Sequence, residues 1–309
     1  MNWQTAVEGY WLEKRKNVSE ATFQDYDRTF RRFADYHGAD LPPVEHIGAV
    51  HVRAYLNHLK EEKQLSDKSL LNAWVALSSF WTWAEHELKL THALRGRVAR
   101  PRYRRPAIEP YSRADINAML NVIGKNAVWT SKNGRRVEES RSTAHRDRAI
   151  LLTLLDTGIR ASELCDLLIS DYDTKTGRLH IRHGKGNKSR FVWCGDAARK
   201  ALWRYLAERP DARPEHPLFA TRTNQALDRN NLRHMLAACA QRAGVDGVTV
   251  HRFRHTFAIT FLRNGGSVLE LQRLLGHERM DTLRIYVTLA ESDLQAAQRR
   301  ASPADNWRL

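Results

Sequence analysis

A short segment rich in arginine and proline divides this 309-residue chain into two parts of different character. Arginines crowd residues 95–105, and prolines interrupt and follow them at Pro101, Pro106 and Pro110. Proline has no backbone N–H and clashes with the preceding helical turn, so the segment does not favour a helix. The sequence therefore predicts an extended basic linker over residues 91–110, with a separate domain on each side of it.

Helical patterns alone fill residues 1–90. The clearest begins after Ser19, a residue type that caps helices, and repeats aromatic residues at three- and four-residue spacing. Four short amphipathic helices are expected to pack as a small bundle. Three of them are expected over residues 20–37, 50–63 and 66–84.

Residues 111–290 combine further helices with one β-hairpin. Leu179 and Ile181 alternate with polar residues, as do Phe191 and Trp193, and glycines supply a turn between them. Residues 124–144 are polar and are expected to form a surface loop. The fold class is therefore mainly α with a small antiparallel β-sheet (α+β). The expected helices cover residues 112–120, 146–156, 197–208, 228–243, 251–263, 267–275 and 281–290.

The charge of the chain indicates a polyanionic partner. Its formal net charge is +15 and its isoelectric point is near 10.0. Nucleic acid is the first candidate for such a protein, although a ribosomal or merely basic protein would share the charge. The arginines of the linker are expected to lie on phosphates. These are Arg95, Arg97, Arg100, Arg102, Arg104 and Arg105, called here the linker arginines.

Cysteine usage and hydropathy favour a soluble cytoplasmic protein. The three cysteines, Cys165, Cys194 and Cys239, form no disulfide framework and are typical of a reducing compartment. No run approaches the ~20 apolar residues that a membrane span requires, and the N-terminus lacks the apolar core of a signal peptide.

The residues with the most chemical meaning lie between positions 251 and 286. His251 and Arg254 fall on one helical face, His277 follows a Leu-Leu-Gly run, and Tyr286 comes shortly after it. Upstream, Arg160 lies in a Thr-Gly-Ile-Arg-Ala-Ser-Glu-Leu stretch and Lys185 in the glycine-flanked hairpin turn.

This set of residue types suits metal-free transfer of a DNA phosphodiester onto tyrosine. The transition state carries extra negative charge, which the planar donor forks of Arg160 and Arg254 can neutralise in place of metal ions. Lys185 can protonate the leaving 5′ oxygen, and His251 can take or share the proton of Tyr286 or bond a non-bridging oxygen. We expect no cofactor and no metal.

The order and spacing of these motifs resemble the tyrosine recombinase (phage-type integrase) family, most closely its Xer-like and transposon or phage integrase branch. The resemblance implies that Glu163 supports the site, and it covers essentially the whole chain. Phe253 stands where the family usually has leucine, and the loop at 124–144 is longer than in compact Xer-like members. The catalytic positions that the resemblance assigns are Arg160, Lys185, His251, Arg254, His277 and Tyr286.

The resemblance also implies an architecture and an assembly. Residues 1–90 would be a helical core-binding (SAM-like) DNA-binding domain, 111–290 the catalytic domain, and 291–309 a tail that docks on a neighbouring protomer. A monomer or dimer off DNA would form a homotetramer on two double-stranded sites with inverted arms, working through 3′-phosphotyrosyl intermediates. Integration, excision and resolution of DNA elements are equally compatible with this chemistry, in a nucleoid-associated protein.

Three alternatives explain part of the sequence. A non-enzymatic DNA-binding protein accounts for the charge but not for the aligned motifs. A type IB topoisomerase uses similar residues, but the Xer-like motifs and the small helical N-terminal domain argue against it. A zinc hydrolase would use His251 and His255 at i, i+4, but Arg252 stands where such helices carry glutamate.

Overall fold

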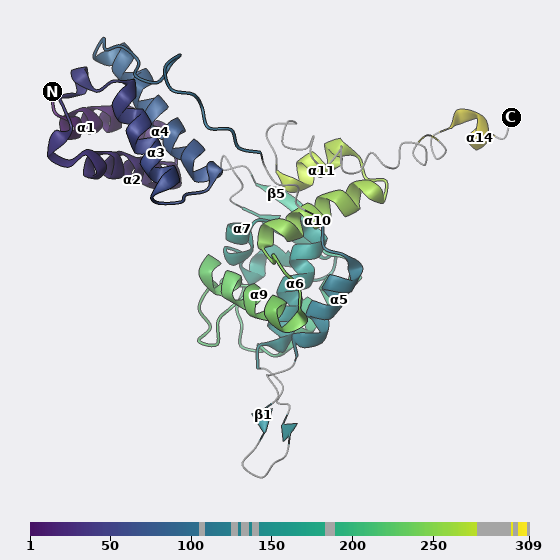
Figure 1. Cartoon of the computed structure of the whole chain (residues 1–309). Helices are drawn as coiled ribbons and strands as arrows, with labels where there is room; N and C mark the ends of the chain where they lie inside the picture. Colours follow the sequence, from purple (N-terminus) through teal and green to yellow (C-terminus); the bar gives the residue numbers. More distant parts are fainter. Residues whose placement is uncertain are drawn as a thin grey trace. The chain divides into compact units, whose positions relative to one another are not determined.

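The computed structural model of the chain forms two compact units, residues 1–106 and 107–309, and each is described here by itself. Figure 1 shows their helices and strands in sequence colours. The residues that the structure describes are 1–104, 109–124, 129–130, 136–137, 142–182, 189–276, 298 and 302–307.

Unit 1 is a bundle of four helices, α1 (Trp3–Lys14), α2 (Glu20–His37), α3 (Ala49–Glu61) and α4 (Asp67–Glu87). Helix α2 begins as expected, because the Ser19 side chain accepts a hydrogen bond from the Thr22 N–H at 3.2 Å. Helix α4 packs against the other three. An aromatic core joins them, with the rings of Trp3 and Phe80 4.6 Å apart between centroids.

The first part of the expected linker belongs to the core of unit 1. Ala93, Leu94 and Val98 are buried against the bundle, in turns rather than extended chain. The Val98 carbonyl accepts a hydrogen bond from the Trp74 indole N–H at 3.3 Å. Apolar residues between the arginines explain this difference from the sequence-based expectation: burial of their side chains outweighs the extended preference of the neighbouring prolines.

Unit 2 is built around α6 (Ala144–Thr157), which is buried on several sides and packs against α8 (Asp196–Ala207) and α10 (Val250–Arg263). Around these lie α5 (Arg113–Val122), α7 (Ala161–Cys165), α9 (Arg229–Ala243) and α11 (Val268–Leu275), with α14 (Pro303–Trp307) near the end of the chain (Figure 1). The helical expectations for the described residues are confirmed to within a few residues, whereas residues 281–290 lie outside them.

One three-stranded antiparallel sheet has the order β3 (Tyr172–Asp173), β4 (Arg178–Ile181) and β5 (Arg190–Trp193). The hairpin was expected, but β3 was not, because two residues give too short a pattern to recognise. The alternation of Phe191 and Trp193 located β5, but it did not show which face of the strand is buried. Leu179 pairs with Val192, and both are buried.

Phe191 and Trp193, the apolar residues that made this strand recognisable, are 44% and 52% exposed. Side chains alternate along a strand, so the inward position of Val192 places Arg190 on the inner face as well. Within residues 124–144, expected to be a loop, β1 (Trp129–Thr130) pairs with β2 (Arg136–Val137).

All three cysteines are free and buried. Among the helices of the described residues, none combines the length and apolar character needed to cross a membrane.

Candidate active site

Arg160 lies between two helices, at a sharp chain reversal. Gly158 ends α6 in the left-handed conformation with φ +58°, and Arg160 is the N-cap residue of α7. A Cβ on Gly158 would lie 2.6 Å from the Phe257 ring and 3.1 Å from the Leu275 side chain. Glycine is therefore required at this position for two reasons: the left-handed backbone angle and the close approach of side chains from α10 and α11.

Glu163 holds Arg160 from the first turn of α7. Its carboxylate accepts the Arg160 backbone N–H at 2.8 Å and the Arg160 Nη1 at 2.6 Å. It also accepts Nη1 and Nη2 of Arg190 at 2.9 and 2.7 Å. Burial alone would raise the pKa of Glu163, but the hydrogen bonds and charge of Arg190, and then those of Arg160, lower it to about 2.

Arg254 is 4% exposed and projects from α10 into the same region. Its Nη1 donates to the Gly158 carbonyl at 2.8 Å, and its Nη2 donates to the Leu275 carbonyl at 2.7 Å. One guanidinium thus ties the end of α6 to the end of α11, and its orientation is set before any ligand binds.

The C-terminal turn of α11 receives three arginines on consecutive carbonyl groups. Arg190 Nε donates to Leu274 at 2.7 Å, Arg254 to Leu275 at 2.7 Å, and Arg160 Nη2 makes a longer contact of 3.5 Å with Gly276. The last carbonyls of a helix lack intrahelical partners and carry partial negative charge, so they favour cations. We call Arg160, Arg190 and Arg254 the arginine cluster.

His251 and His255 are neighbours on α10. Their Nε2 atoms are 3.0 Å apart, and the ring centroids are 4.4 Å apart. His255 is buried whereas His251 is exposed, so the pair runs from the interior to the surface. In the part of the chain that the structure describes, no three histidine, cysteine or carboxylate side chains gather as a metal site would require.

The structure therefore brings together Arg160, Glu163 and Arg254 of the sequence-predicted site. Lys185, His277 and Tyr286 lie outside the described residues, as does Arg105 of the linker arginines. Arg190 is the residue that sequence reasoning missed. The signal that could have identified Arg190 is its position two residues before Val192, because this spacing places both side chains on the same face of β5.

The described linker arginines are all exposed on unit 1. Arg95 is engaged by Glu85, with Nη1 at 3.1 and 2.8 Å from its two oxygens. The guanidinium of Arg100 lies 5.9 Å from the centroid of the Trp74 ring. The segment therefore presents cations to solvent, one of them already neutralised by a carboxylate.

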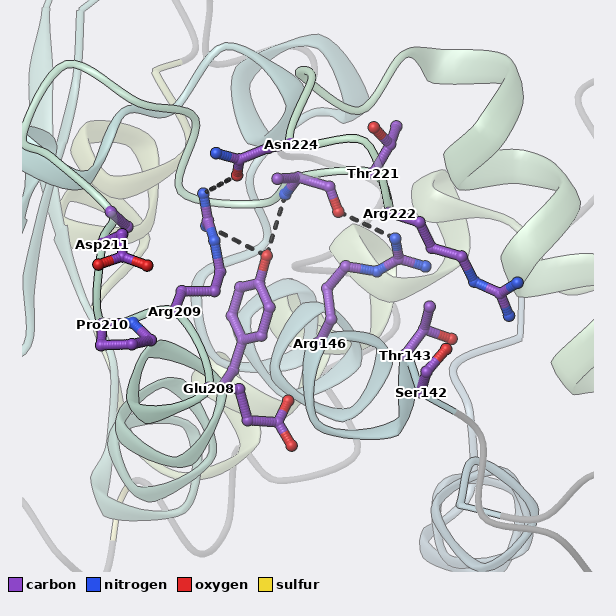
Figure 2. A pocket seen from close by; sticks show the side chains of 13 residues that line it. Ser142, Thr143, Arg146, Glu208, Arg209, Pro210, Asp211, Thr221, Arg222 and Asn224 are labelled. Atoms are coloured by element: carbon purple, nitrogen blue, oxygen red, sulfur yellow. Dashed lines mark hydrogen bonds between the residues drawn. The ribbon is translucent and has the colours of Figure 1, made fainter.

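A cavity of about 310 Å³ lies at the other end of α6 from the arginine cluster (Figure 2). Two arginines of this cavity stabilise the fold through hydrogen bonds. Arg146 donates to the Ala220 carbonyl at 2.9 Å and to the Asp147 carboxylate. Arg209 donates to the Pro217 and Leu218 carbonyls. Its lining contains none of the sequence-predicted site residues.

Two family models match this chain. The phage integrase family matches residues 132–293, more than half of the chain, and the N-terminal SAM-like domain of phage integrases matches residues 7–88. Tyrosine recombinase XerC of Corynebacterium efficiens is 29% identical over 286 residues, which cover 92% of this chain and 86% of that protein. Tyrosine recombinase XerD of Corynebacterium glutamicum is 28% identical over 304 residues, covering 94% and 95%.

Solved structures share the fold. The recombinase XerH bound to a palindromic difH substrate has a TM-score of 0.70 at 21% identity, covering 95% of this chain and 82% of that one. The Tn1549 transposon integrase, in complex with a circular intermediate DNA, has a TM-score of 0.71 at 17% identity, covering 96% and 99%. The chain belongs to the phage integrase family, and it is a tyrosine recombinase, an enzyme that cleaves and rejoins DNA at specific sites.

Proposed function

We propose that Tyr286 is the nucleophile of this recombinase and that Arg160 and Arg254 stabilise the transition state. The tyrosine oxygen attacks a DNA phosphorus and forms a 3′-phosphotyrosyl bond, while the bond to the 5′ oxygen breaks. The residues proposed to carry the reaction are Arg160, Lys185, His251, Arg254, His277 and Tyr286, supported by Glu163.

One observation carries this proposal. Arg160 and Arg254 come from different helices, yet both donate to carbonyls in the last turn of α11, directly before His277 in the sequence. Two guanidinium groups held in this way resist reorientation when charge develops on a phosphate. Such preorganised donors are typically worth on the order of 100- to 1,000-fold in rate each.

The protons are accounted for by the remaining residues. Tyr286 loses its proton to His251 on attack, and Lys185 gives a proton to the leaving 5′ oxygen. His277 bonds a non-bridging phosphate oxygen. The second half of the reaction is the reverse, with a 5′ hydroxyl of the partner strand attacking the phosphotyrosine. Because the covalent bond conserves the energy of the broken linkage, no ATP, metal or cofactor is needed.

We further propose double-stranded DNA with inverted recognition arms as the substrate. Relatives of the same fold are described as bound to a palindromic DNA and to a circular intermediate DNA, which supports this substrate class. Two protomers bind one site, and a homotetramer assembles on two sites from monomers or dimers. The same chemistry can integrate, excise or resolve DNA elements. We place this activity in the cytoplasm, at the nucleoid.

The domains divide this work. Residues 1–90 form the core-binding domain, and the linker arginines within residues 91–110 contact phosphates. Residues 111–290 form the catalytic domain, and the tail at 291–309 docks on a neighbouring protomer. The exposure of the described linker arginines supports their role.

A suicide substrate tests the nucleophile directly. A nick placed next to the cleavage site releases a short strand and traps the protein on DNA. We expect a covalent adduct with the wild-type chain and none with Tyr286→Phe, which removes one oxygen and should leave DNA affinity almost unchanged. An adduct that persists in Tyr286→Phe would assign the attack to another residue.

A further inference from the structure

Arg190 is buried inside the candidate site but was not among its sequence-predicted residues. Its side chain is 9% exposed, and three of its nitrogen atoms are occupied: two by Glu163 and one by the Leu274 carbonyl. All three guanidinium nitrogens of Arg190 therefore meet protein acceptors, and two of them are paired with a carboxylate, whereas the Gly158 and Leu275 carbonyls that accept from Arg254 are neutral groups. The contribution of Arg190 to the reaction must therefore pass through the groups that it holds.

The charges of these groups make a second cation beside Glu163 necessary. Glu163 accepts two hydrogen bonds from Arg160, one from the backbone and one from the guanidinium, and so orients it. A carboxylate paired with Arg160 alone would form a neutral pair, and the field of Arg160 at a nearby phosphate would be largely cancelled. With Arg190 on the same carboxylate, the three side chains keep a net charge of +1.

We propose that Arg190 is a positioning residue that lets Glu163 orient Arg160 without neutralising it. The carboxylate is shared between two cations, one facing the reaction and one turned into the protein. The bond from Arg190 to Leu274 adds a second function, because it fixes this unit to the same helix end that receives Arg254. This inference rests on the proposed role of Arg160 in catalysis.

The test separates charge balance from packing. Arg190→Gln removes the cation and should lower single-turnover cleavage of the suicide substrate on the order of 10- to 100-fold, with a much smaller change in DNA affinity. Arg190→Lys keeps the charge and should recover part of this loss. The decisive variant is Glu163→Gln/Arg190→Gln, which restores a net charge of +1 through Arg160 alone.

An amide at position 163 still offers an oxygen to Arg160, and two amides can satisfy each other. Replacing a buried ion pair by a matched neutral pair is often tolerated in a fold. We therefore expect the double variant to fold and to cleave within about 10-fold of wild type, faster than Arg190→Gln. All rates are divided by the folded fraction measured in the same buffer.

The matched control is Arg146, which shares the chemistry of Arg190 and lines the cavity of Figure 2. It lies in the first turn of α6, whereas the arginine cluster lies near the C-terminal end of that helix. It too is largely buried, pairs with a carboxylate, Asp147, and donates to a backbone carbonyl. Arg146→Gln should lower thermal stability and leave the cleavage rate of the folded protein within about twofold.

The outcomes are distinct. A double variant that is folded but as slow as Arg190→Gln overturns the inference, because the loss would then follow from packing. Equal rate losses in Arg146→Gln and Arg190→Gln would overturn it too. If the wild-type chain formed no covalent adduct, both the proposed function and this inference would fail. If the wild-type chain does form the adduct, the first two outcomes test the role of Arg190 separately from the proposed function.

Discussion

Arg190 binds both carboxylate oxygens of Glu163, at 2.9 and 2.7 Å, while Arg160 binds one of the same oxygens at 2.6 Å. A single buried carboxylate therefore sets the direction of two guanidinium groups, one partly exposed on Arg160 and one largely buried on Arg190. Because Glu163 is itself 4% exposed, bulk water does little to weaken these contacts. The geometry of Arg160 is thus a property of the folded protein and does not wait for DNA.

Substitution of Arg160 and Arg254, the two arginines proposed to act in catalysis, should separate effects on rate from effects on stability. Arg160→Ala and Arg254→Ala should each lower single-turnover cleavage roughly 100- to 1,000-fold, with far smaller effects on DNA binding at one salt concentration. Arg254→Ala should also lower thermal stability more, because it leaves two buried carbonyls without partners. A loss confined to binding would make both residues ordinary phosphate anchors.

The ion pairs of Glu163 should make the free energy of unfolding depend on pH in the acid range. Its pKa is about 2 in the folded chain against an ordinary value of 4.5. A lowered folded-state pKa stabilises the protein above about pH 4.5, and this contribution disappears as the pH falls towards 2. The unfolding free energies of wild type and Glu163→Gln should therefore converge over that window, by roughly 3 kcal/mol. A difference independent of pH would contradict the assignment.

Two glycines in the left-handed conformation, Gly158 and Gly244, allow a test of how strongly the chain reversal before Arg160 depends on close packing. Gly158→Ala must adopt φ +58° and place a Cβ 2.6 Å from Phe257, whereas Gly244→Ala adopts φ +65° with nothing within 4 Å. The control should lose only the cost of the left-handed conformation, about 1–2 kcal/mol. Gly158→Ala should lose clearly more in thermal unfolding, and cleavage should fall with it. Equal losses would mean that Phe257 moves aside easily.

The linker arginines should contribute affinity without sequence preference. Replacing Arg100, Arg102 and Arg104 with alanine should reduce the slope of log affinity against log salt by roughly one for each lost phosphate contact. The double variant Asp27→Ala/Arg31→Ala preserves net charge and removes a paired cation of unit 1 that lies outside the linker, so its slope should stay close to wild type. An unchanged slope in the triple variant would reduce the segment to a tether.

The C-terminal tail should act between protomers. Deleting residues 291–309 should preserve binding to one arm of the DNA but weaken cooperative binding to two arms and alter cleavage. Gel-shift titrations on one-arm and two-arm DNA measure both properties in one experiment. Full cooperativity and normal strand exchange in the shortened chain would exclude docking of the tail.

Much of the fold was predictable because its signals are local. The Ser19 and Ser112 caps, the Gly158 stop and the helical periodicities each depend on neighbouring residues, and the helices were found close to their expected bounds. The sheet was harder: β3 is too short for a pattern, and the aromatic residues Phe191 and Trp193, which made β5 recognisable, lie on its exposed face. Alternation alone cannot tell which of two mixed faces is buried.

The candidate site divides in the same way. Arg160, Glu163, His251 and Arg254 were recognisable because they lie in motifs of fixed spacing. Arg190 was not, since the local pattern of β5 does not show that the face carrying Arg190 and Val192 is the buried one. The carbonyls of Leu274, Leu275 and Gly276 could not be predicted as acceptors, because every residue carries a carbonyl and only the tertiary fold decides which ones meet a cation.

The arginine cluster joins parts of unit 2 that are synthesised far apart in time. Arg160 and Gly276 are 116 positions apart in the sequence, Arg254 and Gly158 are 96 apart, and Arg190 and Leu274 are 84 apart. Chains emerge from the ribosome N-terminus first, so contacts of this range close late. A nascent or truncated chain that ends before α11 contains all three arginines and the Gly158 carbonyl, but it lacks the carbonyls of Leu274, Leu275 and Gly276. The arginine cluster therefore reaches its final arrangement only after α11 has been made, late in the synthesis of the chain.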